Sequence, residues 1–226
     1  MKNRLELFRS QIAAFDGAAD PMSAISKGYF IEEPQQSSTN ALFKRISLRP
    51  RSKILLIGGI GSGKTGLDRV DETDKFTRMA VSDLQTSKIG FTIIGATSLL
   101  YGSFISSMDN IFNHVEYRSA FDVEWDEYAR AFFERVLITR SGQDFFQKDA
   151  LQNLISCSGG VLRDLINLTQ ESIQEAYLAD SNIIAQEHVE KAIFSLGRAK
   201  MLGLNSEQSA TLRNLTNRVS ASQKVS

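Results

Sequence analysis

The sequence predicts an α/β fold, in which a parallel-sheet core is followed by a small all-helical domain. Three observations lead to this prediction. Residues 53–57 form an apolar run without polar alternation, which is typical of a strand buried on both faces of a parallel sheet. A glycine-rich segment follows this run directly. From about residue 122 onward, apolar residues recur every three or four positions, which indicates amphipathic helices.

The other elements follow from local patterns along the chain. Apolar residues at helical spacing predict a helix over residues 5–15, and a short helix is predicted over residues 40–47. A second buried strand is expected over residues 91–95. The helical half should contain four helices, at residues 125–140, 148–157, 161–178 and 186–196. Polar residues from about Ser206 predict either a frayed tail or a cut made before another domain.

The composition is that of a folded protein with one or two domains. The chain has 226 residues, of which 42% are hydrophobic and 23% charged. Lysine plus arginine equals aspartate plus glutamate at 26 each, so the overall charge does not support a DNA partner. DNA binding would need a local basic surface. The N-terminal residues lack the apolar stretch of a signal peptide or membrane anchor, so we predict a cytoplasmic protein without a membrane partner.

The glycine-rich segment predicts a phosphate-binding site. It reads, in order, Gly58, Gly59, Ile60, Gly61, Ser62, Gly63, Lys64 and Thr65. This sequence fits the P-loop pattern G-x-x-x-x-G-K-[ST] without a mismatch, and it follows a predicted strand. Backbone N–H groups of such a loop cradle phosphates, Lys64 should reach the β- and γ-phosphates, and the Thr65 hydroxyl should coordinate Mg²⁺. We therefore predict that the chain binds ATP or ADP with Mg²⁺.

A second motif lies in the helical half. The segment reads Ser158, Gly159, Gly160, Val161, Leu162, Arg163, Asp164 and Leu165. It resembles the sensor 2 motif of AAA+ ATPases, in which an arginine on the third lid helix reaches the γ-phosphate. The neighbouring predicted helices resemble the other lid helices, and the last resembles that of origin-recognition and Cdc6-like members. The resemblance spans residues 28–196 and implies an AAA+-type P-loop core followed by a helical lid, with Arg163 as the sensor arginine.

The strand predicted over residues 91–95 carries a third point of resemblance. It continues into Ala96, Thr97 and Ser98. In AAA+ proteins, sensor 1 is a polar residue at the end of the strand beside the P-loop strand. The resemblance implies that Thr97 or Ser98 helps to orient the attacking water. Small polar residues after a strand are also ordinary turn chemistry, and this alternative stays open.

The sequence departs from the AAA+ pattern in two places. No apolar strand ending in acidic residues, the Walker B motif, stands between Thr65 and Ile93, although residues 66–72 resemble the downstream end of one. Asp68 and Asp71 are the nearest candidates for the carboxylate that activates water. We predict that a segment is absent at or near the junction of Thr65 and Gly66. The second departure is that residues 103–113 contain no arginine, so an arginine finger is not expected there.

These observations divide the chain into four parts. Residues 1–27 are expected to form an N-terminal helix and linker, residues 28–121 the nucleotide-binding core, residues 122–200 the lid, and residues 201–226 a polar tail. The resemblance implies an ATPase that acts as a nucleotide-dependent switch or assembly module, with a protein partner or as a homo-oligomer. Two alternatives stay open: a non-hydrolysing nucleotide-binding scaffold or signalling protein, which the missing Walker B strand favours, and a DNA-loading ATPase.

Three further residues could carry chemistry. The single cysteine, Cys157, lies in an apolar helical run, so we expect a buried core residue. His114 is expected to be a polar residue at the start of a strand rather than a catalytic base. His188 is expected on a solvated helix face.

Overall fold

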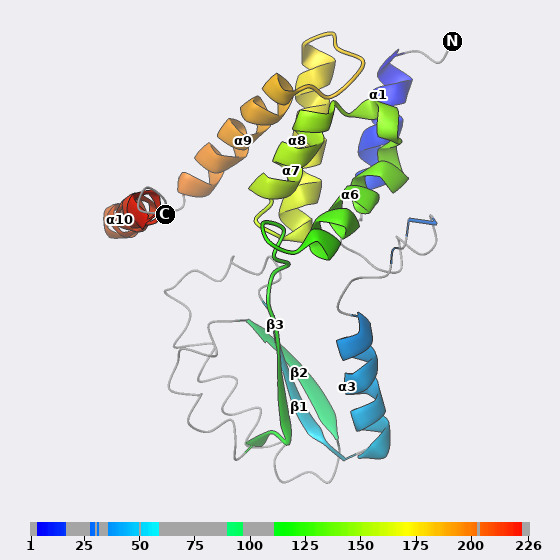
Figure 1. The fold of residues 1–226 in the computed structure, drawn as a ribbon, viewed down its shortest axis with the longest axis vertical. Helices are drawn as coiled ribbons and strands as arrows, with labels where there is room; N and C mark the ends of the chain where they lie inside the picture. Colours follow the sequence, from blue (N-terminus) through cyan, green and yellow to red (C-terminus); the bar gives the residue numbers. More distant parts are fainter. Residues whose placement is uncertain are drawn as a thin grey trace.

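The computed structural model describes residues 4–16, 28–29, 31, 36–49, 51–58, 90–96, 111–202 and 204–222. Within these residues, a three-stranded parallel sheet is combined with seven α-helices (Figure 1). The helices are α1 (Arg4–Phe15), α3 (Gln36–Leu48), α6 (Glu127–Ser141), α7 (Lys148–Cys157), α8 (Leu162–Leu178), α9 (Gln186–Met201) and α10 (Ser206–Ser222). The strands are β1 (Lys53–Gly58), β2 (Phe91–Ala96) and β3 (His114–Arg118). The predicted α/β class is confirmed.

Strand β1 is the central strand of the sheet. Strands β2 and β3 both run parallel to it, and the order across the sheet is β2-β1-β3. Leu55 and Ile57 of β1 are fully buried and pack with Phe112, which lies just before β3. The continuous apolar run in the sequence therefore reflects a strand with a neighbour on each side, in which Ile54, Leu55 and Ile57 are buried and Leu56 is partly exposed.

Helices α1 and α6 to α9 share one continuous apolar core. Phe133, Leu137, Leu154, Leu165 and Ile173 are fully buried in it. The four helices predicted for this half are present, and α9 continues past its predicted end to Met201. The three-to-four spacing of apolar residues predicted these helices correctly because each one buries a single stripe against its neighbours.

Helix α1 comes from the start of the chain but packs on α8 and α6 of the helical half. Its buried residues Phe8 and Phe15 belong to the same core as the later helices. The guanidinium of Arg4 donates hydrogen bonds to the carbonyls of Tyr177 and Ser181, each at 2.9 Å. Arg4 therefore ties the start of α1 to the last turn of α8 and to the turn that follows it.

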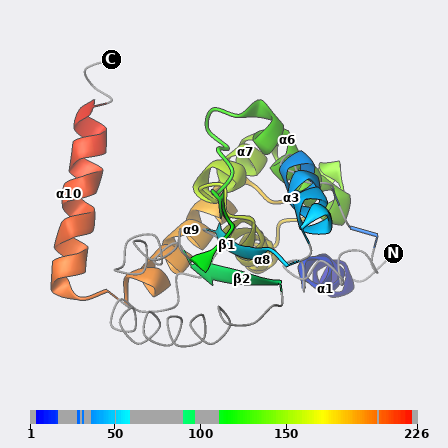
Figure 2. The same cartoon turned by 90° about the horizontal axis from the view of Figure 1, so that it is seen from below.

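The predicted frayed tail is wrong over residues Ser206–Ser222, because they form helix α10. Its start is closed by two reciprocal bonds: the Gln208 N–H donates to the Asn205 side chain at 2.8 Å, and the Asn205 N–H donates to the Gln208 side chain at 3.0 Å. This arrangement is a capping box, with asparagine in the cap position. Helix α10 projects away from the other helices (Figure 2).

Candidate functional site

The structure describes only the first residue of the predicted phosphate loop. Gly58 is the last residue of β1. The other predicted binding residues, Gly59, Gly61, Ser62, Gly63, Lys64 and Thr65, lie outside the described residues. The same holds for Asp68, Thr97 and Ser98, and for the junction of Thr65 and Gly66. The predicted missing segment therefore stays a prediction.

The strand ends next to Gly58 are described. Gly58 pairs with Ala96 at the end of β2 and with Arg118 at the end of β3. All three strands thus end at the same level of the sheet. In open α/β sheets, ligands bind outside the carboxyl ends of the strands. The sequences predicted as phosphate loop and sensor 1 follow β1 and β2 at this edge. Arg118 ends β3 at this edge, although residues 103–113 supply no arginine for a finger.

The start of α8 is tied to the chain that leaves this edge. The backbone N–H of Phe121, three residues after β3, donates to the carbonyl of Gly160 at 3.1 Å. Gly160 lies two residues before Leu162, where α8 begins, and Arg163 is the second residue of that helix. Figure 1 shows the strands running toward the helical half and the α7–α8 connection at the end of the helices nearest to the sheet.

Arg163 is exposed and adds positive charge to the first turn of α8. The N-terminus of a helix carries a partial positive charge that attracts anions. The guanidinium of Arg163 adds a full positive charge at this helix end. The neighbouring carboxylate of Asp164 is 3.0 Å from the ammonium group of Lys200 on α9. Asp164 is therefore already paired with a residue of another helix.

The two glycines of the predicted sensor 2 segment have different structural roles. Both adopt positive φ angles, 58° at Gly159 and 75° at Gly160. A Cβ atom on Gly160 would lie 1.6 Å from the carbonyl oxygen of Phe121, whereas a Cβ atom on Gly159 would meet no atom within 4 Å. Only glycine fits at position 160, because the backbone after β3 passes directly against it.

The expectations for His188 and Cys157 are wrong. His188 is 1% exposed, and its Nδ1 accepts the backbone N–H of Ala185 at 2.9 Å, so it caps the start of α9. Its Nε2 lies 3.4 Å from a carboxylate oxygen of Glu187 but forms no hydrogen bond within the described residues. Cys157 is exposed rather than buried in the core.

Neighbouring atoms still cover part of the exposed Cys157 side chain, and this desolvation raises the pKa of its thiol, which keeps it protonated at neutral pH and opposes a reactive thiolate. His114 starts β3, as expected. Within the part of the chain that the structure describes, no three His, Cys, Asp or Glu side chains are grouped so that they could hold a metal ion. Thr65, the predicted Mg²⁺ ligand, is outside that part.

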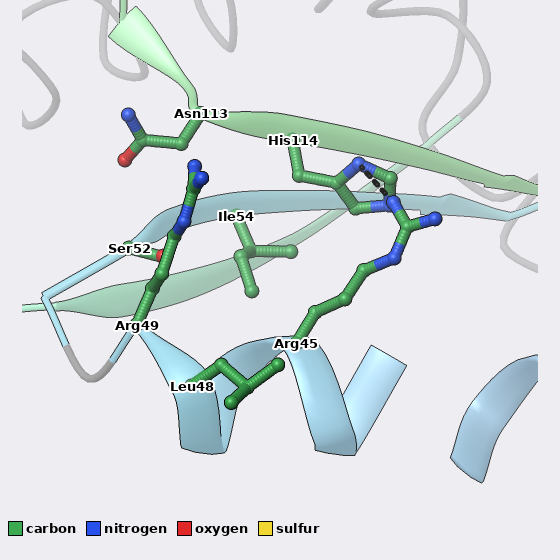
Figure 3. Close-up of a pocket in the computed structure, with 7 residues that line it drawn as sticks. All are labelled: Arg45, Leu48, Arg49, Ser52, Ile54, Asn113 and His114. Atoms are coloured by element: carbon green, nitrogen blue, oxygen red, sulfur yellow. Dashed lines mark hydrogen bonds between the residues drawn. The ribbon is translucent and has the colours of Figure 1, made fainter. Parts of the chain in front are cut away.

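A pocket of about 330 Å³ lies at the opposite edge of the sheet, where the strands begin (Figure 3). Its lining comprises Arg45, Leu48, Arg49, Ser52, Ile54, Asn113 and His114. It is separate from the carboxyl edge that Gly58 reaches. The sequence prediction did not include these residues, although residues 44–53 contain five lysines and arginines and no acidic residue.

Comparison with known proteins identifies no family: no family model matches this sequence, and no characterised protein is significantly similar to it. None of the helices among the described residues is long and apolar enough to span a membrane.

Proposed function

We propose that this chain binds ATP or ADP with Mg²⁺ through residues 58–65 and acts as a nucleotide-dependent switch of the AAA+ type. The observation that carries the proposal is the position of Gly58. The first residue of a complete P-loop sequence stands at the carboxyl end of the central strand of a parallel sheet. That position is the one from which a P-loop must start in order to turn its backbone N–H groups toward phosphate.

The neighbouring elements support the same proposal. Strand β2, which leads into Thr97 and Ser98, pairs directly with β1, as the resemblance to sensor 1 requires. The helical half follows the sheet, and its α8 begins next to the chain that leaves β3. In the proposed switch, Lys64 and Arg163 contact the γ-phosphate from the two halves of the molecule. Loss of that phosphate on hydrolysis then releases the lid.

The hydrolytic step in this proposal is in-line attack of water on the γ-phosphate, which yields ADP and phosphate. Mg²⁺ held by Thr65, together with Lys64, spreads the charge of the transition state. Thr97 or Ser98 orients the water, and Asp68 and Asp71 are the candidates for the activating carboxylate. Assembly with a protein partner or with further copies of the chain belongs to the same AAA+ resemblance.

A second candidate is a scaffold that binds nucleotide without hydrolysing it. The observation that favours it is the sheet itself: among the described residues, no strand ends in the acidic pair of a Walker B motif. Steady-state phosphate release separates the two candidates, because both bind ATP and only the switch turns it over. A DNA-loading ATPase rests on the resemblance of the lid alone.

The first experiment tests nucleotide binding. Millimolar ATP with Mg²⁺ should raise the melting temperature of the protein, because a ligand that binds only the native state stabilises it. Lys64→Ala should remove most of this shift, since Lys64 supplies the charge at the β- and γ-phosphates. Lys148→Ala, which removes an exposed lysine from α7, should leave the shift unchanged. An equal shift in the Lys64→Ala protein would disprove the P-loop assignment.

A further inference from the structure

The amino edge of the sheet carries a concentrated positive charge on a chain that is neutral as a whole. Between residues 44 and 53, five of ten residues are lysine or arginine and none is acidic, whereas the full sequence has 26 basic and 26 acidic residues. Such a local run indicates an interaction with a polyanion more strongly than overall charge does. The fold decides whether these cations point in one direction.

The structure gathers three of these arginines around a hollow surface. Arg45 and Arg49 line the 330 Å³ pocket, and Arg49 and Arg51 line a second pocket that shares Ser52 and Asn113 with the first. Figure 3 shows Arg49 extending toward Asn113 and Arg45 extending toward His114, with Ile54 and Leu48 between the two arginines. We call this surface, defined by Arg45, Arg49, Arg51, Ser52 and Asn113, the amino-edge basic surface.

Within the part of the chain that the structure describes, negative charge is sparse around this surface. No residue that lines either pocket is acidic. Among the described residues, neither Arg49 nor Arg51 forms a salt bridge. The nearby carboxylate of Glu116 accepts a hydrogen bond from Nε2 of His114 at 3.0 Å, and Nδ1 of that histidine accepts one from Arg45 at 3.4 Å.

The end of helix α3 accounts for only part of this charge. A basic residue in the last turn of a helix is stabilised by the partial negative charge there, and Arg45 occupies that turn. Arg49 and Arg51 lie beyond the last helical residue, Leu48. Leu48 is 81% exposed beside them. The surface therefore combines guanidinium groups, hydroxyl and amide groups and one exposed apolar side chain.

We propose that the amino-edge basic surface binds the sugar–phosphate backbone of a nucleic acid. Arginine matches phosphate geometry with a planar fork of donors, and serine and asparagine are common additional phosphate contacts. Repeated phosphates along a strand can meet Arg45, Arg49 and Arg51 together, which a single anion cannot. This surface lies at the edge of the sheet opposite to Gly58, so the inference does not depend on the proposed nucleotide site.

The test is fluorescence anisotropy with a labelled 20-base-pair DNA duplex and a labelled single-stranded RNA of equal length. The full chain should bind at least one of them at 50 mM salt, and the affinity should fall steeply as salt increases, because binding releases counterions. Arg49→Gln combined with Arg51→Gln should weaken binding about tenfold and lower the slope of log K against log salt by about 2. Both side chains are exposed, so this variant should fold.

The matched control combines Arg135→Gln with Lys148→Gln, which removes the same charge from exposed positions on α6 and α7. It should change the affinity less than twofold. Equal losses in the two variants would assign the effect to net charge and overturn the proposal. So would absence of binding to both nucleic acids. Binding to phosphatidylserine vesicles but to neither nucleic acid would show that the surface serves a membrane instead.

Discussion

The helical half and the sheet differ in how much buried apolar surface their described residues provide. The helical half has a continuous core in which residues from five helices meet, including Phe8 of α1 and Phe133 of α6. Among the described residues, the apolar cluster of the sheet has three buried members, Leu55, Ile57 and Phe112. Hydrophobic stabilisation grows with the apolar area buried. The proposed lid is thus the part whose stability the described contacts explain best.

A backbone hydrogen bond joins the exit of the sheet to the helical half. The backbone of Phe121 passes within hydrogen-bonding distance of Gly160, so the exit from β3 is fixed to the entrance of α8. A switch that links phosphate contacts to lid position needs such a connection, because a flexible linker would transmit no change.

Phe133→Ala should have the largest effect on stability. Phe133 is fully buried at the centre of the helical core, and truncation of such a side chain leaves a cavity that costs about 3–5 kcal/mol of unfolding free energy. Urea denaturation followed by circular dichroism measures it. Phe194→Ala is the control, since Phe194 is 72% exposed, and it should change stability by less than about 0.5 kcal/mol. Similar losses in both variants would contradict the described core.

Gly160→Ala should destabilise the junction by on the order of 3 kcal/mol, because it combines an unfavourable positive φ with a clash against the backbone of Phe121. Gly159→Ala has the same kind of φ but no neighbouring atom, so it should cost only about 1–2 kcal/mol. The difference between the two variants in urea denaturation measures the close approach alone. A cost that is equal at both positions would show that the approach is not present in solution.

Arg163→Ala tests whether the two halves meet at the γ-phosphate. It should weaken ATP binding about tenfold and leave ADP binding almost unchanged, because the diphosphate offers nothing for this side chain to hold. Isothermal titration with each nucleotide measures the ratio. Arg135→Ala, on the exposed face of α6, is the control and should affect neither nucleotide. Equal losses for ATP and ADP would mean that Arg163 has only a structural role.

Asn205→Ala should have the smallest effect on global stability. It removes the side chain that accepts the N–H of Gln208, so amide exchange of Gln208 should become faster. Because α10 projects away from the other helices, the urea midpoint should stay within error of the wild type (Figure 2). A clear shift of the midpoint would show that α10 packs against the core in solution.

Local sequence patterns predicted the elements that carry most of the fold. Helices α6 to α9 were predicted because burial of one face imposes a period on the sequence. Strand β1 was predicted because a strand within a parallel sheet has a continuous apolar run. The P-loop pattern can be recognised in the sequence because its residues are consecutive, and its binding of phosphate stays a prediction. The capping box of Asn205 and Gln208 was also visible locally, as a cap residue followed three positions later by glutamine, and it would have predicted α10.

Other features depended on residues far apart in the chain. The sequence alone determined the parallel-sheet and helical character, the phosphate-loop motif and the basic run of residues 44–53. Only the tertiary structure decided that α1 joins the helical core, that His188 is buried, that position 160 requires glycine, and that Arg45 and Arg49 share a pocket with His114. Such contacts cannot be recognised from a period or a motif, because each one joins segments that lie far apart in the sequence.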